Sequence, residues 1–248
     1  MTTVDVGMGV RELTAEPGTG TVVAVYDKAA YVRGAGGVFA LTSTAAPPGP
    51  IHLRCRTLPE ATTSETVWLD EDAVAGAGWS AGLRAPTWRP TLPDPSAFGA
   101  VPDVPPAELL DGPLPDAWPD HGDVLAAGDL TRAAEVLGGR GAGLTPAGDD
   151  VLAGILLSAA TLWGPTPSAA DAAKAARTND IAAAFLHWAA RGQSIAPVHD
   201  LLHALACDDA AAARQALAAL RSFGASSGSD LAYGLTLGLR YLPRAPPG

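Results

Sequence analysis

The chain is short of several features, and each shortage excludes a class of protein. Its two cysteines, Cys55 and Cys207, lie far apart with no metal-ligand spacing around them, which fits a reducing compartment and not a disulfide scaffold. The longest uncharged helical run, residues 151–163, is well short of the roughly 20 residues that span a bilayer. Residues 1–17 carry acids and no apolar core, so no signal peptide is expected there. We therefore expect a cytoplasmic protein without a membrane segment.

Basic residues are also scarce. Sixteen Lys and Arg stand against 26 Asp and Glu, for a formal net charge of −10. Nucleic acid is an unexpected partner, because phosphate backbones are bound by clustered Lys and Arg. A small anionic metabolite remains possible as a ligand if a local positive site exists. With 48% hydrophobic residues in 248, the chain is predicted to be globular, as one large domain or two modest ones.

The pattern along the chain predicts an α+β protein. Short β-branched runs with turn residues between them indicate strands that pair as antiparallel neighbours, at 21–27, 29–34, 38–43, 51–57 and 66–74. Ten prolines in 86–122 break any long helix or strand. Alanine-rich segments with helical spacing then continue to residue 242. We predict an antiparallel β-rich domain (1–85), a proline-rich connector (86–122) and a helical domain (123–248) with two buried central helices.

One loop stands out, GLTPAGDD (143–150), because two adjacent aspartates open a helix that is otherwise apolar. Thr145 is a suitable helix cap, and Pro146 suits the first turn. Asp149 and Asp150 would then interact favourably with the helix dipole. This structural interpretation explains one solvent-side acid well. It explains the second less well, since a buried carboxylate needs a cation, a metal or several N–H donors.

A second loop, FGASSGSD (223–230), opens another apolar helix in the same way. The two registers are Gly148-x-Asp150-x-x-x-Gly154 and Gly228-x-Asp230-x-x-x-Gly234. A glycine one turn after each acid would let two helix backbones approach closely. The repeated spacing therefore suggests that both helix N-termini face one pocket, although the abundance of glycine leaves chance as an alternative.

Two helix N-termini would supply unpaired N–H groups and positive dipole ends for a phosphate or carboxylate. GGRGAG (138–143) would add flexible amides, including those of Gly141 and Gly143, and the guanidinium of Arg140. Asp150 and Asp230 would hold Mg²⁺ or accept hydrogen bonds from a substrate amide. The glycine run has neither the Gly-Lys-Ser/Thr of a P-loop nor dinucleotide spacing after a strand.

These segments carry a resemblance. GLTPAGDD, RTNDIAAAFLHWAARG and FGASSGSDLAYGL, in this order and spacing, resemble a bacterial family of domains of unknown function that includes the AllH subunit of oxamate carbamoyltransferase. The resemblance covers residues 20–242 and is strongest over 138–236; the β-rich part matches only in outline, through turns such as GPIHL (49–53).

The resemblance implies a cytoplasmic protein of purine or ureide nitrogen catabolism that works beside partner subunits. It implies carbamoyl transfer between phosphate and an oxamate-like acceptor. Of the residues that match, Asp149, Asp150 and Asp230 are the candidates for catalysis. The candidates for substrate or phosphate binding, together with Arg140 and Gly141 from the loop analysis, are Gly143, Thr145, Gly148, Ser226, Ser227 and Gly228. The chain departs from the family pattern at Ala147, Asn179, Ala182 and Ala225, where the family more often has hydroxyls or an imidazole.

Other side chains invite simpler interpretations. His199 and His203 share a helix face at metal-ligand spacing, but the leucines around them favour an ordinary amphipathic helix. Ser226 and Ser227 are more typical of hydroxyl ligands or a cap than of nucleophiles, because no histidine is close in sequence. Three hypotheses remain: a carbamoyltransferase-type enzyme subunit, a non-catalytic metabolite-binding subunit, and a hydrolase or lyase of another small amide.

Overall fold

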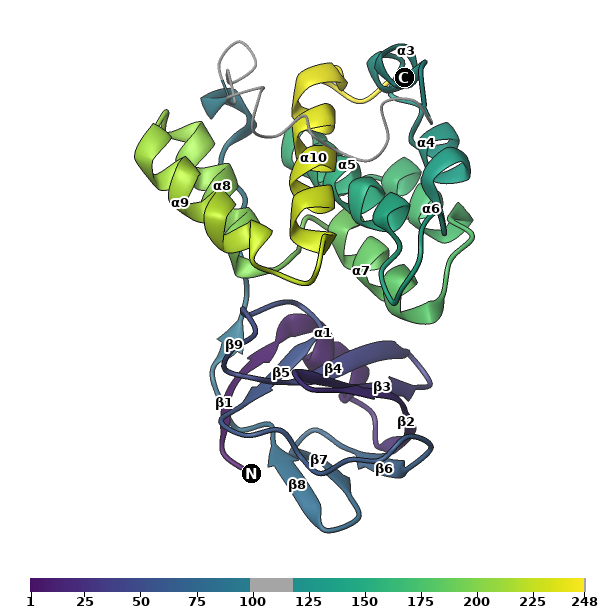
Figure 1. Ribbon diagram of the computed structural model, residues 1–248, viewed down its shortest axis with the longest axis vertical. Coiled ribbons are helices and arrows are strands. Elements are labelled where there is room, and N and C mark those ends of the chain that lie inside the picture. The colour runs from purple at the N-terminus through teal and green to yellow at the C-terminus, as the bar shows by residue number, and fades with distance from the viewer. Residues whose placement is uncertain (99–117, 248) are drawn as a thin grey trace. The chain divides into compact units, whose positions relative to one another are not determined.

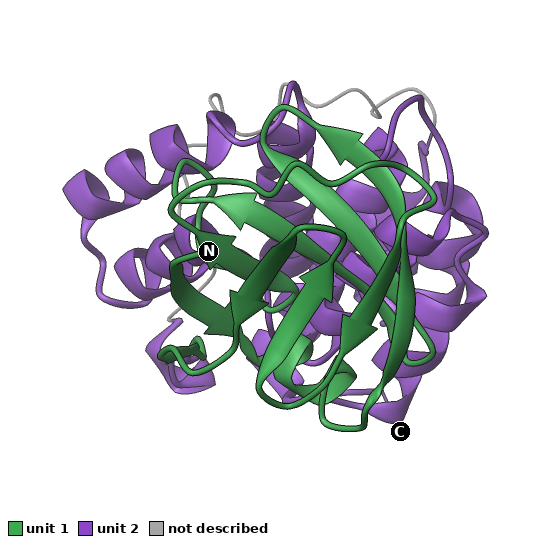
Figure 2. Cartoon of the chain, turned by 90° about the horizontal axis from the view of Figure 1, so that it is seen from below, with its two compact units in different colours: residues 1–90 green, residues 91–248 purple. Residues whose placement is uncertain are grey.

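The computed structural model describes residues 1–98 and 118–247, which form two compact units, Met1–Pro90 and Thr91–Gly248 (Figures 1 and 2). The first unit is a sheet with one short helix, and the second is helical, so the α+β prediction is confirmed. Most of the predicted proline-rich connector, residues 99–117, lies outside the described residues. No described helix is long and apolar enough to cross a membrane.

The first unit holds nine described strands in one sheet, ordered β8-β7-β6-β2-β3-β4-β5-β1-β9. The elements are β1 (Thr3–Gly7), α1 (Met8–Leu13), β2 (Gly18–Tyr26), β3 (Ala29–Gly34), β4 (Gly37–Ser43), β5 (His52–Cys55), β6 (Thr66–Leu69), β7 (Ala73–Gly76), β8 (Trp79–Gly82) and β9 (Thr87–Trp88). Side chains alternate between buried and exposed along β6, as expected for a sheet with one covered face. The N-terminal ammonium of Met1, just before β1, donates to the carbonyl oxygen of Ser80 in β8, so the start of the chain reaches the strand at the far edge of the sheet.

The prediction that the closely spaced strands are all antiparallel neighbours is wrong for one pair, because β4 pairs with β5 in parallel. β1 and β9, which were not predicted, also pair in parallel. The connection through residues 44–51 carries the chain back along β4, so that β5 starts opposite Ala40. Closely spaced strands therefore do not have to form hairpins when the connecting loop is held in a fixed shape.

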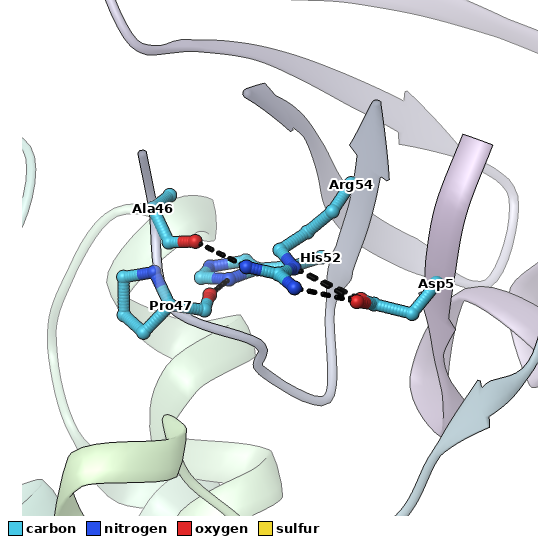
Figure 3. Close-up of polar contacts among 5 residues, drawn as sticks. All are labelled: Asp5, Ala46, Pro47, His52 and Arg54. Carbon is cyan, nitrogen blue, oxygen red and sulfur yellow. Dashed lines mark hydrogen bonds and ion pairs between the residues drawn. The ribbon is translucent and has the colours of Figure 1, made fainter. Parts of the chain in front are cut away.

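Polar side chains hold this loop (Figure 3). The Arg54 guanidinium forms a two-pronged ion pair with Asp5, with 2.6 Å between Nη2 and Oδ2, and its Nη1 donates to the carbonyl oxygen of Ala46 at 2.8 Å. The ring of the buried His52 makes a hydrogen bond through Nδ1 to the carbonyl oxygen of Pro47 at 2.9 Å. These contacts hold the connection in place, because the carbonyl groups of Ala46 and Pro47 each find a side-chain partner inside the unit.

The second unit is built around two buried helices, α5 and α10, as predicted (Figure 1). Its described elements are η1 (Pro95–Ala97), α3 (His121–Ala126), α4 (Leu130–Leu137), α5 (Ala147–Trp163), α6 (Pro167–Ala175), α7 (Asp180–Ala190), α8 (Ala196–Ala206), α9 (Ala210–Arg221) and α10 (Ser227–Tyr241). Helix α5 is uncharged after its first turn and buried on every side, and it packs against α10, α7, α4 and α6. Only a helix at the centre of a unit can bury such a surface.

Candidate functional site

Helices α5 and α10 run in the same direction with their backbones in contact. A Cβ added at Gly234 would collide with the carbonyl oxygen of Val151, and one added at Gly154 would collide with the backbone of Leu231 and Leu235. Farther along, the hydroxyl of Ser158 in α5 donates to the carbonyl oxygen of Leu235 at 2.9 Å. The two glycines are therefore required by close backbone approach.

The N-terminal ends of these helices meet through a pair of hydroxyls. Thr145 Oγ1 and Ser227 Oγ lie 2.9 Å apart, within hydrogen-bond distance, although 82 positions separate them in sequence. The prediction that Thr145 caps α5 is wrong, because the helix begins after Pro146 and has no side-chain cap. Thr145 instead joins the loop before α5 to the first turn of α10.

Asp149 holds the surrounding loops together. Its Oδ1 accepts a hydrogen bond from the backbone amide of Gly139 at 2.9 Å, and its Oδ2 accepts one from the hydroxyl of Thr178. Burial raises the pKa of this carboxyl, and the bonds from Thr178 and Gly139 act in the opposite direction. Each oxygen accepts one hydrogen bond from within the protein, so Asp149 joins the start of α5 to the loops at Gly139 and Thr178.

Asp150 and Asp230 differ from Asp149 because each has a carboxyl oxygen without a hydrogen-bond partner among the described residues. Their side chains are buried, and within the described residues the Oδ2 atom of each has no hydrogen-bond partner. Burial, which is the largest cause, raises the pKa of Asp150 to about 8; the negative charges of Asp230 and Asp149 add to the rise, and the hydroxyls of Ser227 and Thr145 oppose it. Burial also raises the pKa of Asp230, and the hydroxyl of Ser226 opposes that rise. Perturbed buried acids of this kind are typical of functional sites.

Most first-turn amides of the two helices already have acceptors. The amide of Gly148 donates to the carbonyl oxygen of Arg140 at 2.8 Å, and the amide of Gly228 donates to that of Phe223 at 3.0 Å. The amides of Asp149 and Asp150 both donate to Pro146, and those of Ser229 and Asp230 to Ser226. An anion would therefore find few free N–H groups in the helices themselves, contrary to the expectation from the sequence.

The glycine-rich loop before α5 offers amides instead. Within the described residues, the backbone N–H groups of residues 141–145 donate to no protein acceptor. Gly141 and Gly143 adopt positive φ, 117° and 99°, and Arg140, Gly141 and Gly143 are all exposed. The loop is therefore a second possible source of donors beside the carboxyls.

Sequence reasoning missed the segment between α6 and α7. Thr178 bonds Asp149, and Asn179 caps α7 while its side-chain amide donates to the carbonyl oxygen of Leu144 at 2.9 Å. A side chain at Gly139 would collide with the carbonyl oxygen of Arg177. The RTND segment thus supports the candidate site, and its place within the resemblance is the signal from which it could have been found.

The donor set for a metal is small. Among the described residues no group of three or more His, Cys, Asp or Glu side chains is placed to hold a metal ion. Mg²⁺ needs only one or two carboxylates beside water and substrate oxygens, so Asp150 and Asp230 fit it in number once both are ionised. His199 and His203 are used otherwise: each Nε2 is engaged, with the amide of Ser194 and with Thr91.

The comparison with known families places this site in a recognisable segment. No solved structure matches the chain. A family model does match, over residues 137–239, which include α5, all but the end of α10 and both of the loops that enter these helices. The segment that carries Asp149, Asp150 and Asp230 is thus similar to the family described as oxamate carbamoyltransferase subunit AllH.

Proposed function

We propose that the chain acts as a subunit of a carbamoyltransferase related to oxamate carbamoyltransferase, and that it binds a small amide-bearing anion where α5 and α10 begin. The family match supports this role, because the matched residues 137–239 include every predicted site residue. The observation that carries the proposal is the pair of buried carboxyl oxygens, on Asp150 and Asp230, that have no partner among the described residues.

The groups present suit carbamoyl transfer. The nitrogen of an oxamate-like acceptor attacks the carbamoyl carbon, the bond from that carbon to the phosphate oxygen breaks, and phosphate leaves with the electron pair. The attacking nitrogen must lose a proton, and a carboxylate with a raised pKa accepts a proton more readily than an ordinary one. Asp230 would serve as this base, and the amides of residues 141–145 together with Arg140 would bind the anionic end.

A partner subunit is part of the proposal. Within the described residues no cationic side chain pairs with Asp149, Asp150 or Asp230. Transfer from a phosphate gains most of its acceleration from positive groups that stabilise the charge on the leaving oxygens. The lack of a cation beside these three acids favours the second candidate function. In that function the chain is a cytoplasmic subunit that binds the metabolite, and its partner subunits supply the chemistry.

Ligand binding by the purified full-length chain tests the proposal. Carbamoyl phosphate, oxamate and phosphate are each added in a thermal-shift titration, and a ligand of the folded state should raise the melting temperature. Ser227→Ala should reduce the shift because it removes one of the two bridging hydroxyls, whereas Asp171→Ala, an exposed acid on α6, should leave it unchanged. Equal shifts in all three proteins would refute a site at these helix ends.

Turnover separates the two candidate functions. If the chain alone converts carbamoyl phosphate and oxamate, and Asp230→Asn abolishes the activity, it is the catalytic subunit. If the chain binds the ligands without converting them, and turnover appears only with partner subunits, the binding function is correct.

A further inference from the structure

The two carboxyls with unpartnered oxygens are buried to a degree that calls for a partner. Asp150 is 7% exposed and Asp230 is 3% exposed. Burying a polar atom without a hydrogen bond costs free energy, so such atoms are rare in folded proteins. Asp149 lies in the same turn of α5 and has both oxygens bonded, so among the three acids at these helix ends only Asp150 and Asp230 have an oxygen without a partner in the described residues.

The surroundings of this pair contain hydroxyls and acids. The hydroxyls of Ser227 and Thr145 interact with the side chain of Asp150, and the hydroxyl of Ser226 interacts with that of Asp230; the negative charges of Asp230 and Asp149 also act on Asp150. No cation among the described residues offsets the negative charges. Two neighbouring buried carboxyls without a cation do not both ionise, and one of them keeps a proton. The pair then presents one O–H donor and one carboxylate acceptor.

A primary carboxamide has the complementary groups. Its carbonyl oxygen accepts a hydrogen bond, and its NH₂ group donates. A carboxylate of the same shape has only acceptors and adds a negative charge, which a buried carboxylate repels. We propose that Asp150 and Asp230 together recognise the carboxamide end of the ligand and reject a carboxylate there, with Asp150 donating to the carbonyl oxygen and Asp230 accepting from the nitrogen. This inference rests on the proposed function and assigns the orientation of the ligand within that site.

The protonation state of Asp150 sets the pH range over which the site prefers a carboxamide to a carboxylate. Burial is the main reason that the pKa of Asp150 rises to about 8, so Asp150 is protonated at neutral pH and loses its proton above that value. The hydrogen bond to the carbonyl oxygen is lost with that proton. Amide binding should therefore weaken as the pH rises through 8, while Asp230 remains an acceptor.

Calorimetry with two probes of nearly equal shape tests the inference. Oxamate and oxalate differ by one amide in place of one carboxylate. The full chain at pH 7 should bind oxamate at least tenfold more tightly than oxalate, and oxamate should bind several-fold more weakly at pH 9. Asp150→Asn keeps a donor at all pH values, so it should still bind oxamate and should lose the weakening at pH 9. Asp230→Asn should bind oxamate at least tenfold more weakly, while Asp171→Asn should match the wild type.

Each outcome decides between the proposals. Equal binding of oxamate and oxalate, with both lost in Ser227→Ala, overturns the carboxamide assignment and leaves the anion site standing. The assignment is also overturned if oxamate binds Asp150→Asn more weakly at pH 9 than at pH 7, as it does the wild type. Absence of binding by either probe in a protein whose circular dichroism is native counts against both this inference and the proposed function.

Discussion

The replacement of Asp150 by asparagine should make the protein more stable as the pH rises. The pKa of Asp150 is raised by burial from 3.8 to about 8, so between these values the folded chain holds a proton that the unfolded chain has released. A group whose pKa is raised in this way loses stability with rising pH. At pH 7 the cost is about 4 kcal/mol, from roughly 1.4 kcal/mol for each pH unit above 3.8.

Asparagine has no proton to gain or lose, so the variant avoids this cost. Its amide leaves a buried donor without a partner, which costs about 1–3 kcal/mol. The net expectation is a gain of about 1–3 kcal/mol at pH 7 and little change or a small loss at pH 5. The difference between variant and wild type should grow by about 1.4 kcal/mol per pH unit between pH 4 and 8.

Urea denaturation at pH 5, 6, 7 and 8 measures this difference. Far-UV circular dichroism is the appropriate signal, because every described α-helix except α1 lies in the second unit. Asp149 and Asp230 are present in both proteins, so their own pH dependence largely cancels in the comparison. A difference that stays constant from pH 5 to 8 would show that Asp150 is ionised in the folded state, and the reasoning about its burial would be refuted.

Three further substitutions have defined outcomes. Gly234→Ala should lower the free energy of unfolding by about 3 kcal/mol, because its Cβ would push two helix backbones apart; thermal melting measures this. Asp149→Asn should lower the free energy of unfolding in urea by about 1–3 kcal/mol, because the amide nitrogen cannot accept one of the two hydrogen bonds that the carboxyl oxygens accept. Arg54→Met should cost about 3 kcal/mol by leaving the half-buried Asp5 without its partner, and hydrogen exchange in residues 44–51 should rise.

Controls accompany these substitutions. Gly122→Ala, in α3, would meet only ordinary van der Waals contacts with Tyr241 and should leave the melting temperature unchanged or slightly raised. Gly234→Ala behaving like Gly122→Ala would contradict the close contact of α5 and α10. Unchanged stability of Asp149→Asn would contradict the role of its two hydrogen bonds in holding the loops.

Much of the second unit could be predicted because its signals are local. The apolar character of residues 151–163 marks a central helix, and the glycine one turn after each acid marks close helix contact at Gly154 and Gly234. The difference between Asp149 and Asp150 could not be predicted. They are adjacent residues of the same type. They differ because the Gly139 amide and the Thr178 hydroxyl lie within hydrogen-bond distance of Asp149.

The first unit shows the same limit in its strand pairing. β3 was predicted at its observed residues, 29–34, because alternation and turns define a hairpin strand. β1 was not predicted, since it is short and carries Asp5, whose partner Arg54 is 49 positions away. The parallel pairing of β4 and β5 depends on loop contacts of Arg54 and His52 that no periodicity encodes.

The pairing of β1 with both β5 and β9 has a consequence for biosynthesis. β1 leaves the ribosome before its two neighbours, which appear about 50 and 80 residues later, at Cys55 and Thr87. The hairpins from β2 to β4 are complete much earlier, so β1 must wait in an unpaired state while they form. A nascent chain stalled before Thr87 would expose the free edge of β1, and that edge is where a chaperone or a neighbouring nascent chain would attach.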